Sequence, residues 1–194
     1  MRKFDCKAIV IGVSAGGMLA LRKIIPVLSA DFPAPVIIVQ HMHPYSDNFM
    51  IHDLDRKSTL NVRQAEEKEN ISAGNVYIAP SNYHLLVEQD KTFSLSVCER
   101  LNFSRPSIDI LFETASEVYQ DKLLGIVLTG ANKDGSEGAK IIKQRGGKII
   151  VQDPKTAESK VMPQSAIANT NPDHILPLTD IGDFLNKYIN KRNK

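Results

Sequence analysis

One stretch near the amino terminus, residues 7–28, constrains the fold more than any other part of the chain. It opens with the apolar run Ala8–Val13, rich in β-branched residues, and passes through a glycine-rich turn into a segment with apolar residues at helical spacing. This order predicts a strand, a tight turn and a helix. Ser14 then lies at the carboxyl end of the strand, where the free amides of the helix point towards it. The residues Gly12-x-Ser14-x-Gly16 therefore fit the nucleophile-elbow pattern in the context that the pattern requires.

The rest of the chain alternates between strand-like and helix-like segments. Strands are expected at residues 36–40, 61–64, 76–79, 123–128 and 148–152, and helices at 45–57, 107–119 (capped by Ser107), 137–144, 163–168 and 181–189. Residues 83–99 predict an antiparallel hairpin because apolar and polar residues alternate there. The sequence thus predicts an α/β fold with a doubly wound, mainly parallel sheet, helices on both faces and an appended antiparallel hairpin. We expect a single domain over residues 1–194.

Charge and composition argue against several classes of protein. The 24 basic and 22 acidic residues leave a net charge of +2, which is too small to indicate a nucleic-acid partner. No run approaches the roughly twenty apolar residues that cross a membrane, so we expect no membrane insertion and a cytoplasmic location. Cys6 and Cys98 lack metal-ligand spacing and are expected to be free thiols. Asp53 and Asp55 are interpreted as part of a solvated acidic face.

Three of the expected strands end in polar residues that suit acyl transfer. These residues are Ser14, His41 and Asp134. Sites in open α/β sheets form beyond the carboxyl ends of the strands. A hydroxyl nucleophile needs a base, and the base needs an acid that holds its tautomer, so the three residue types match a catalytic triad. Their order along the chain differs from that of the α/β-hydrolases, which argues against a lipase-like enzyme but not against a triad.

Each of these residues also has a purely structural interpretation. Ser14 can cap the helix that follows it, and Asp134 belongs to a good turn dipeptide. His43 is a rival base to His41 on local sequence. A nucleotide-binding oxidoreductase is an alternative function because a glycine-rich turn between strand and helix also cradles pyrophosphate. Against it, Ser14 replaces the middle glycine of that fingerprint, and the second strand ends in Gln40 and His41 instead of an acid.

Six segments in chain order read GVSAGG, VQHM, the stretch from LDRKSTLNVRQAE to ISAGNVYIAPSNYHLLVE, FSRPSIDILF, VLTGANKDGSEG and VMPQSAIA. Together they resemble the catalytic domain of the chemotaxis protein-glutamate methylesterases, the CheB type, from Ala8 to about Ile167. On the matching positions, the resemblance implies that Ser14 is the nucleophile, His41 the base and Asp134 the orienting acid. The resemblance also favours His41 over His43 as the base.

This resemblance implies a substrate and a partner as well. The family hydrolyses γ-glutamyl methyl esters on the cytoplasmic helices of methylated chemoreceptors, releasing methanol, and many members deamidate particular receptor glutamines. Neither a cofactor nor a metal is implied. We expect the Ala15 amide to stabilise the oxyanion, with a second donor from residues 131–133. A catalytically silent receptor-binding module of the same fold is the alternative.

Regulation is the point on which the sequence departs from the family pattern. Full-length members commonly carry an amino-terminal receiver domain, whereas this chain begins immediately before the first expected strand. We therefore expect no control by a receiver domain of its own, and a separate receiver or regulatory protein is left open as a partner.

Among the other histidines, His84 is expected to approach the site more closely than His52 or His174.

Overall fold

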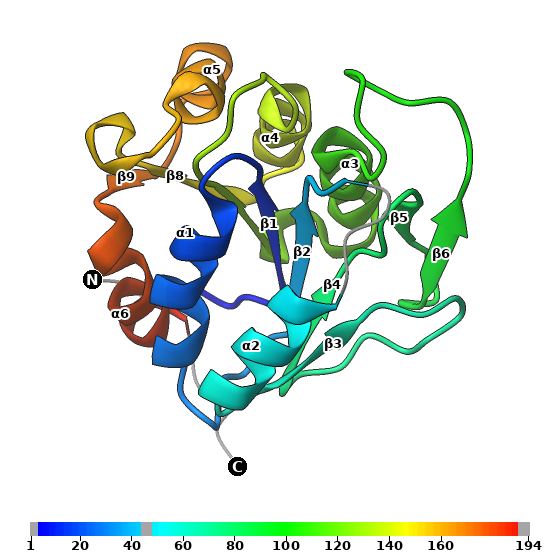
Figure 1. Ribbon diagram of the computed structural model, residues 1–194. Helices are drawn as coiled ribbons and strands as arrows, with labels where there is room; N and C mark the ends of the chain where they lie inside the picture. Colours follow the sequence, from blue (N-terminus) through cyan, green and yellow to red (C-terminus); the bar gives the residue numbers. More distant parts are fainter. Residues whose placement is uncertain (1–3, 44–47, 190–194) are drawn as a thin grey trace.

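The computed structural model describes residues 4–43 and 48–189, and it confirms the α/β fold (Figure 1). Seven strands form one sheet in the order β3-β4-β2-β1-β7-β8-β9, and every neighbouring pair in it is parallel. The strands of this sheet are β1 (Ala8–Val13), β2 (Val36–Gln40), β3 (Asn61–Gln64), β4 (Asn75–Ile78), β7 (Leu123–Val127), β8 (Lys148–Gln152) and β9 (His174–Leu176).

Helices cover both faces of the sheet, as expected from the alternating pattern (Figure 1). One face carries α1 (Gly17–Ile24), α2 (Phe49–Lys57) and α6 (Leu178–Tyr188), and the other carries α3 (Ile108–Tyr119), α4 (Ser136–Gln144) and α5 (Val161–Asn169). Short 3₁₀ turns occupy residues 25–27, 120–122 and 154–156. The central strands are buried on both faces. Their side chains pack with those of the helices in two apolar clusters, one on each side of the sheet, and this packing holds the helices in place.

The predicted hairpin exists, but it is not part of the large sheet. Strands β5 (His84–Val87) and β6 (Phe93–Ser96) pair with each other in antiparallel fashion and form a separate two-stranded sheet. Phe93 at the start of β6 also exchanges backbone hydrogen bonds with Lys68 and Glu69 of the preceding loop. The apolar side chains of the hairpin pack into the apolar cluster on the face of the sheet that carries α3, α4 and α5. It is therefore appended by side-chain packing and loop pairing.

Some element boundaries differ from those expected. Strand β9 was not predicted, because its three residues are half-buried or exposed and lie immediately before Pro177. The described part of α2 begins at Phe49, and residues 45–47 of the helix predicted at 45–57 lie outside the described residues.

Both cysteines are free, as expected. None of the described helices is long and apolar enough to span a bilayer.

Asp53 corrects one expectation about the surface, because it is 4% exposed and does not belong to a solvated face. Its carboxylate accepts hydrogen bonds from Arg22 Nε at 2.7 Å and from Lys57 Nζ at 2.8 Å. These hydrogen bonds lower the pKa of Asp53 to about 2. Because Arg22 lies on α1 and Asp53 on α2, the ion pair ties the two helices together.

The strand order explains why three distant residues can meet. Strand β1 lies between β2 and β7 at the centre of the sheet. From β1 the chain passes to β2 on one side, and it later returns to β7 on the other side. This reversal is a topological switch point, where open α/β sheets place their sites. The loops after β1, β2 and β7 therefore share one edge of the sheet.

Candidate active site

The turn after β1 has the shape that its glycines predict. Gly16 has φ 78°, a left-handed conformation that side chains with a Cβ rarely adopt. A Cβ on Gly17 would lie 1.8 Å from Gln40 Oε1, so only glycine allows α1 to start this close to β2. Helix α1 begins at Gly17, which leaves Ser14 on the turn in front of it. The nucleophile-elbow geometry therefore depends on both glycines.

Gln40 at the end of β2 fixes the two loops relative to each other. Its amide nitrogen donates hydrogen bonds to the carbonyl of Ser14 at 3.0 Å and to that of His41 at 2.8 Å. The side chain is 6% exposed, so these hydrogen bonds are shielded from water. Gln40 thereby holds the backbones of Ser14 and His41 at a fixed separation.

The side chains of Ser14, His41 and Asp134 form a continuous chain of contacts. His41 Nδ1 lies 3.2 Å from Ser14 Oγ, and His41 Nε2 lies 2.8 Å from Asp134 Oδ2. An ionised carboxylate can only accept, so the proton of the neutral ring belongs on Nε2 and the lone pair on Nδ1 faces the serine. This arrangement can move a proton from Ser14 to His41.

Asp134 is fully buried and surrounded by donors. Apart from His41, it accepts hydrogen bonds from the amides of Ile108 at 2.7 Å and Asp109 at 3.2 Å and from the Ser107 hydroxyl at 3.0 Å. Burial on its own raises the pKa of Asp134, but the hydrogen bonds from His41 and Ile108 outweigh it, and the pKa lies below its usual value. Asp134 is therefore ionised at neutral pH.

These contacts correct the expected capping of α3. Ser107 occupies the N-cap position, but its side chain accepts no hydrogen bond from the helix. Its hydroxyl instead donates to Asp134, whose carboxylate takes the amides at the start of the helix. A carboxylate carries more negative charge than a hydroxyl oxygen and interacts more strongly with a helix amino terminus. The proposed catalytic acid is thus also the cap of α3.

Asp109 on α3 likewise accepts a hydrogen bond from a backbone amide at the start of a helix, here α4. Its Oδ1 accepts the Gly138 amide at 2.7 Å, and its Oδ2 accepts the Asn102 side-chain amide at 3.0 Å. The same Asn102 nitrogen lies 3.3 Å from Asp134 Oδ1, so it bridges the two carboxylates. Burial, aided by the nearby charge of Asp134, raises the pKa of Asp109 to about 6. The sequence offered no local signal for this pair.

His84 supports the site from behind and does not touch the three central residues. It is fully buried, its Nδ1 accepts the Ser107 amide at 3.1 Å, and its Nε2 lies 3.1 Å from the Glu99 carbonyl. Burial lowers the pKa of His84, so it is neutral at physiological pH. His84 thus approaches the site as expected, but it is linked to Asp134 through Ser107, which hydrogen-bonds to both residues.

The remaining site expectations concern the oxyanion and the second histidine. Ala15 follows Ser14 on the exposed side of the turn, and its carbonyl accepts the Thr129 hydroxyl at 2.8 Å. Its role as an oxyanion donor, like that of residues 131–133, stays a prediction. His43 is exposed, and it is His41 that contacts Ser14. Within residues 4–43 and 48–189, no cluster of three or more His, Cys, Asp or Glu side chains is suited to a metal.

Known proteins have sequences similar to this chain. The family description CheB methylesterase matches residues 9–185. The chain is 56% identical over 178 residues to a putative protein-glutamate methylesterase/protein-glutamine glutaminase of Leptospira interrogans, with 92% of each chain covered. It is 38% identical to the protein-glutamate methylesterase/protein-glutamine glutaminase of Thermotoga maritima, covering 92% of this chain but only 53% of that protein.

The structural comparison points the same way. The crystal structure of the Thermotoga maritima CheB methylesterase catalytic domain superposes with a TM-score of 0.91 at 38% identity, covering 95% of this chain and 100% of that one. Sequence and fold therefore agree over nearly the whole length. The chain belongs to the CheB methylesterase family, whose members are carboxylic-ester hydrolases.

Proposed function

We propose that this chain is a protein-glutamate methylesterase that hydrolyses γ-glutamyl methyl esters of methylated chemoreceptors with Ser14, His41 and Asp134 as its catalytic residues. The observation that carries the proposal is the position of the His41 ring, which contacts Ser14 Oγ on one side and the Asp134 carboxylate on the other. The names of the Leptospira and Thermotoga relatives support the choice of a glutamyl ester as substrate.

In the acylation step, Ser14 Oγ attacks the ester carbonyl carbon while its proton moves to His41 Nδ1. The ring becomes positively charged between two fixed partners, and the buried Asp134 carboxylate stabilises that charge through Nε2. The oxyanion forms near the Ala15 amide at the head of α1. When the tetrahedral intermediate collapses, the C–O bond to the methoxy group breaks, and His41 returns the proton so that methanol leaves.

Deacylation repeats the sequence with water. Water attacks the acyl carbonyl, His41 accepts the proton, and the bond to Ser14 Oγ breaks as the proton returns to that oxygen. The product is a free glutamate side chain. The same steps on a glutamine side chain would release ammonia in place of methanol, which agrees with the glutaminase part of the relatives' names.

Methanol release from a methylated chemoreceptor fragment tests the proposal. We expect the parent chain to release methanol, and Ser14→Ala to lower kcat by about 10⁴-fold or more because the nucleophile is gone. Binding of the fragment by Ser14→Ala should persist, since the fold is not disturbed. A folded parent chain that binds the fragment without hydrolysing it would instead support the silent receptor-binding module.

A further inference from the structure

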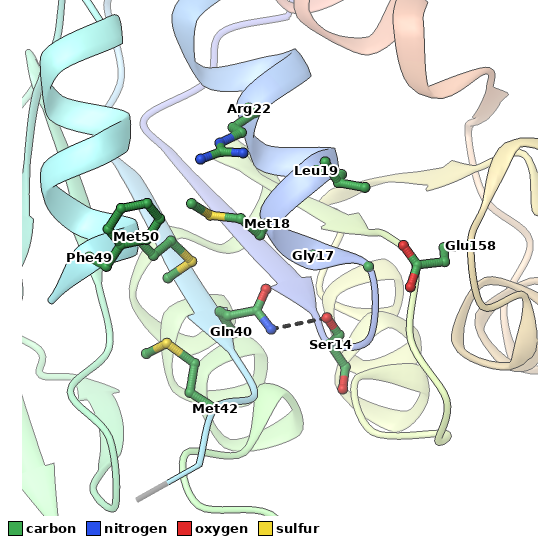
Figure 2. Close-up of a pocket in the computed structure, with 11 residues that line it drawn as sticks. Ser14, Gly17, Met18, Leu19, Arg22, Gln40, Met42, Phe49, Met50 and Glu158 are labelled. Atoms are coloured by element: carbon green, nitrogen blue, oxygen red, sulfur yellow. Dashed lines mark hydrogen bonds between the residues drawn. The ribbon is translucent and has the colours of Figure 1, made fainter. Parts of the chain in front are cut away.

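A cavity of about 510 Å³ opens directly beside Ser14, between the first turns of α1 and α2 (Figure 2). Ser14 itself belongs to its lining, together with Gln40 from the end of β2. The cavity therefore continues the proposed active site and is not a separate depression. Its location on the sheet edge beyond β1 and β2 is the location at which ligands enter open α/β sheets.

The walls of this cavity are mainly apolar. The apolar residues that line it are Met18, Leu19, Met42, Phe49 and Met50. Leu19 is 57% exposed and Phe49 is 59% exposed, so large apolar side chains face the solvent at its mouth. Exposed apolar surface rimmed by polar residues marks an interaction site, and methionine side chains adapt to partners of varied shape.

Two charged residues, Arg22 and Glu158, line the cavity. Arg22 pairs through Nε with the nearly buried Asp53 at 2.7 Å, and Arg56 and Lys57 contact the same carboxylate. Glu158 is an exposed residue beside Gly16, on the turn that follows Ser14. An anionic group beside the Ser14 turn would meet the Glu158 carboxylate, whereas the cations around Asp53 lie further along α1 and α2. Because the rest of the lining is mainly apolar, the part of the cavity beside Ser14 favours an uncharged, apolar group.

The volume of the cavity exceeds what the reaction requires. Cavities of about 300–1,000 Å³ enclose whole drug-sized ligands, whereas a methyl ester has only a few heavy atoms. The ester must reach Ser14 Oγ at the edge of the cavity, so the rest of the space faces other parts of the substrate. In a protein substrate, the groups nearest to the esterified glutamate are the side chains beside it on the polypeptide.

A second cavity of mixed polar and apolar lining lies at His41. It measures about 100 Å³ and is lined by Phe103 and Pro106 as well as by Arg100 and Arg105, and Met42 lines both cavities. Phe103 is 97% exposed on the loop before α3. A polypeptide that places a glutamate over Ser14 and His41 can therefore touch apolar side chains on both sides.

We propose that the methionine-lined cavity between α1 and α2 binds an apolar side chain of the substrate polypeptide that lies beside the esterified glutamate. This inference rests on the proposed function and adds a specificity determinant to it. Leu19 and Phe49 form the mouth of the site, and Met18, Met42 and Met50 form its interior. The enzyme then selects its target glutamates by an apolar neighbour as well as by the ester.

Two substrates separate this binding from the chemistry. One is a methylated chemoreceptor fragment, and the other is p-nitrophenyl acetate, a small ester without neighbouring side chains. In the double variant Leu19→Ala/Phe49→Ala, we expect the ratio of kcat/KM for the fragment to kcat/KM for the small ester to fall about tenfold, mainly through KM. Ile175→Ala is the matched control, because Ile175 is 47% exposed on the edge strand β9, and its ratio should equal that of the parent.

A change in the substrate completes the test. Replacing the apolar neighbours of the target glutamate with serine should lower the parent's kcat/KM for the fragment about tenfold, with less than a twofold further effect in the double variant. Two outcomes overturn the binding proposal alone, provided that the parent releases methanol. In one, the double variant keeps the parent's ratio of kcat/KM values for the two substrates. In the other, the enzyme substitutions and the substrate substitutions lower kcat/KM independently of each other. A parent that releases no methanol overturns the proposed function and the occupant named here.

Discussion

The two sides of the candidate active site are built on different principles. On the side of α3 and α4, Asp134 is completely buried and accepts hydrogen bonds from the backbone and from Ser107. On the side of α1 and α2, Ser14 faces an open cavity with a mainly apolar lining. The first side fixes charges in place, and the second side offers a surface to which a substrate can adapt.

This difference assigns separate tasks to the two sides. A preorganised carboxylate stabilises a charged imidazole without reorganisation, which requires burial and many donors. A binding surface for a polypeptide requires exposure, because its partner must reach it. Substitutions on the buried side should therefore act on kcat and on stability, and substitutions on the open side should act on KM.

The largest effect should come from the buried side. Asp134→Asn keeps the shape of the side chain but removes the negative charge that orients His41 and stabilises its protonated form. We expect kcat for methanol release to fall about 10⁴-fold with little change in KM. A folded Asp134→Asn variant whose kcat falls less than tenfold would contradict a role for Asp134 in the mechanism.

The second effect probes the junction between the two sides. In Gly17→Ala, the new Cβ must displace Gln40, which holds the carbonyls of Ser14 and His41. We expect kcat to fall by about 10²-fold, because displacements of about 1 Å have consequences of this size. Gly74→Ala is the control, since its Cβ would meet nothing within 4 Å and its left-handed φ of 86° should cost stability alone. Equal kcat values for the two variants would contradict this role of Gln40.

A third effect should appear in stability and depends on pH. The pKa of Asp109 is about 6 in the fold and lies near 3.8 without it, so the folded state binds more protons between these values. The contribution of Asp109 to stability is therefore lost as pH rises from about 4 to 6. We expect the unfolding free energy of the parent relative to Asp109→Asn to fall by about 2 kcal/mol over that range. Urea titrations at pH 4.5 and 7.0 measure it, and a constant difference would contradict the assignment.

The smallest effect belongs to the open side. Phe103→Ala removes an almost fully exposed side chain beside His41, so neither folding nor chemistry should suffer. We expect KM for a methylated receptor fragment to rise about threefold while kcat is retained, because single exposed contacts contribute little to binding. A loss of kcat in steady-state methanol release would show that this loop serves the chemistry instead.

Strand ends and glycines carried most of what the sequence could predict. Central strands such as β1 and β2 were predicted with their observed ends, since apolar runs buried on both faces leave little ambiguity. Because parallel strands share one edge at their carboxyl ends, Ser14, His41 and Asp134 could be expected to meet there. The family resemblance then selected His41 over His43.

The parts that were missed depend on contacts between elements. Asp109 and Gly138 lie 29 residues apart, and their hydrogen bond exists because α3 and α4 begin next to each other. Nothing near Asp109 in the sequence indicates this partner. Asp53 appeared to belong to a charged surface, and only the approach of Arg22 from α1 buries it. Strand β9 is too short for a periodic pattern to reveal it.

The most direct test of the account compares two histidines that lie two residues apart. His41→Ala removes the only described link between Ser14 Oγ and Asp134, whereas His43→Ala removes an exposed side chain of the same type. In methanol release from a methylated receptor fragment, we predict that His41→Ala lowers kcat by about 10⁴-fold or more and that His43→Ala retains the parent's kcat. Equal activity of the two variants, or a loss confined to His43→Ala, would contradict the proposed role of His41 and the catalytic chain built on it.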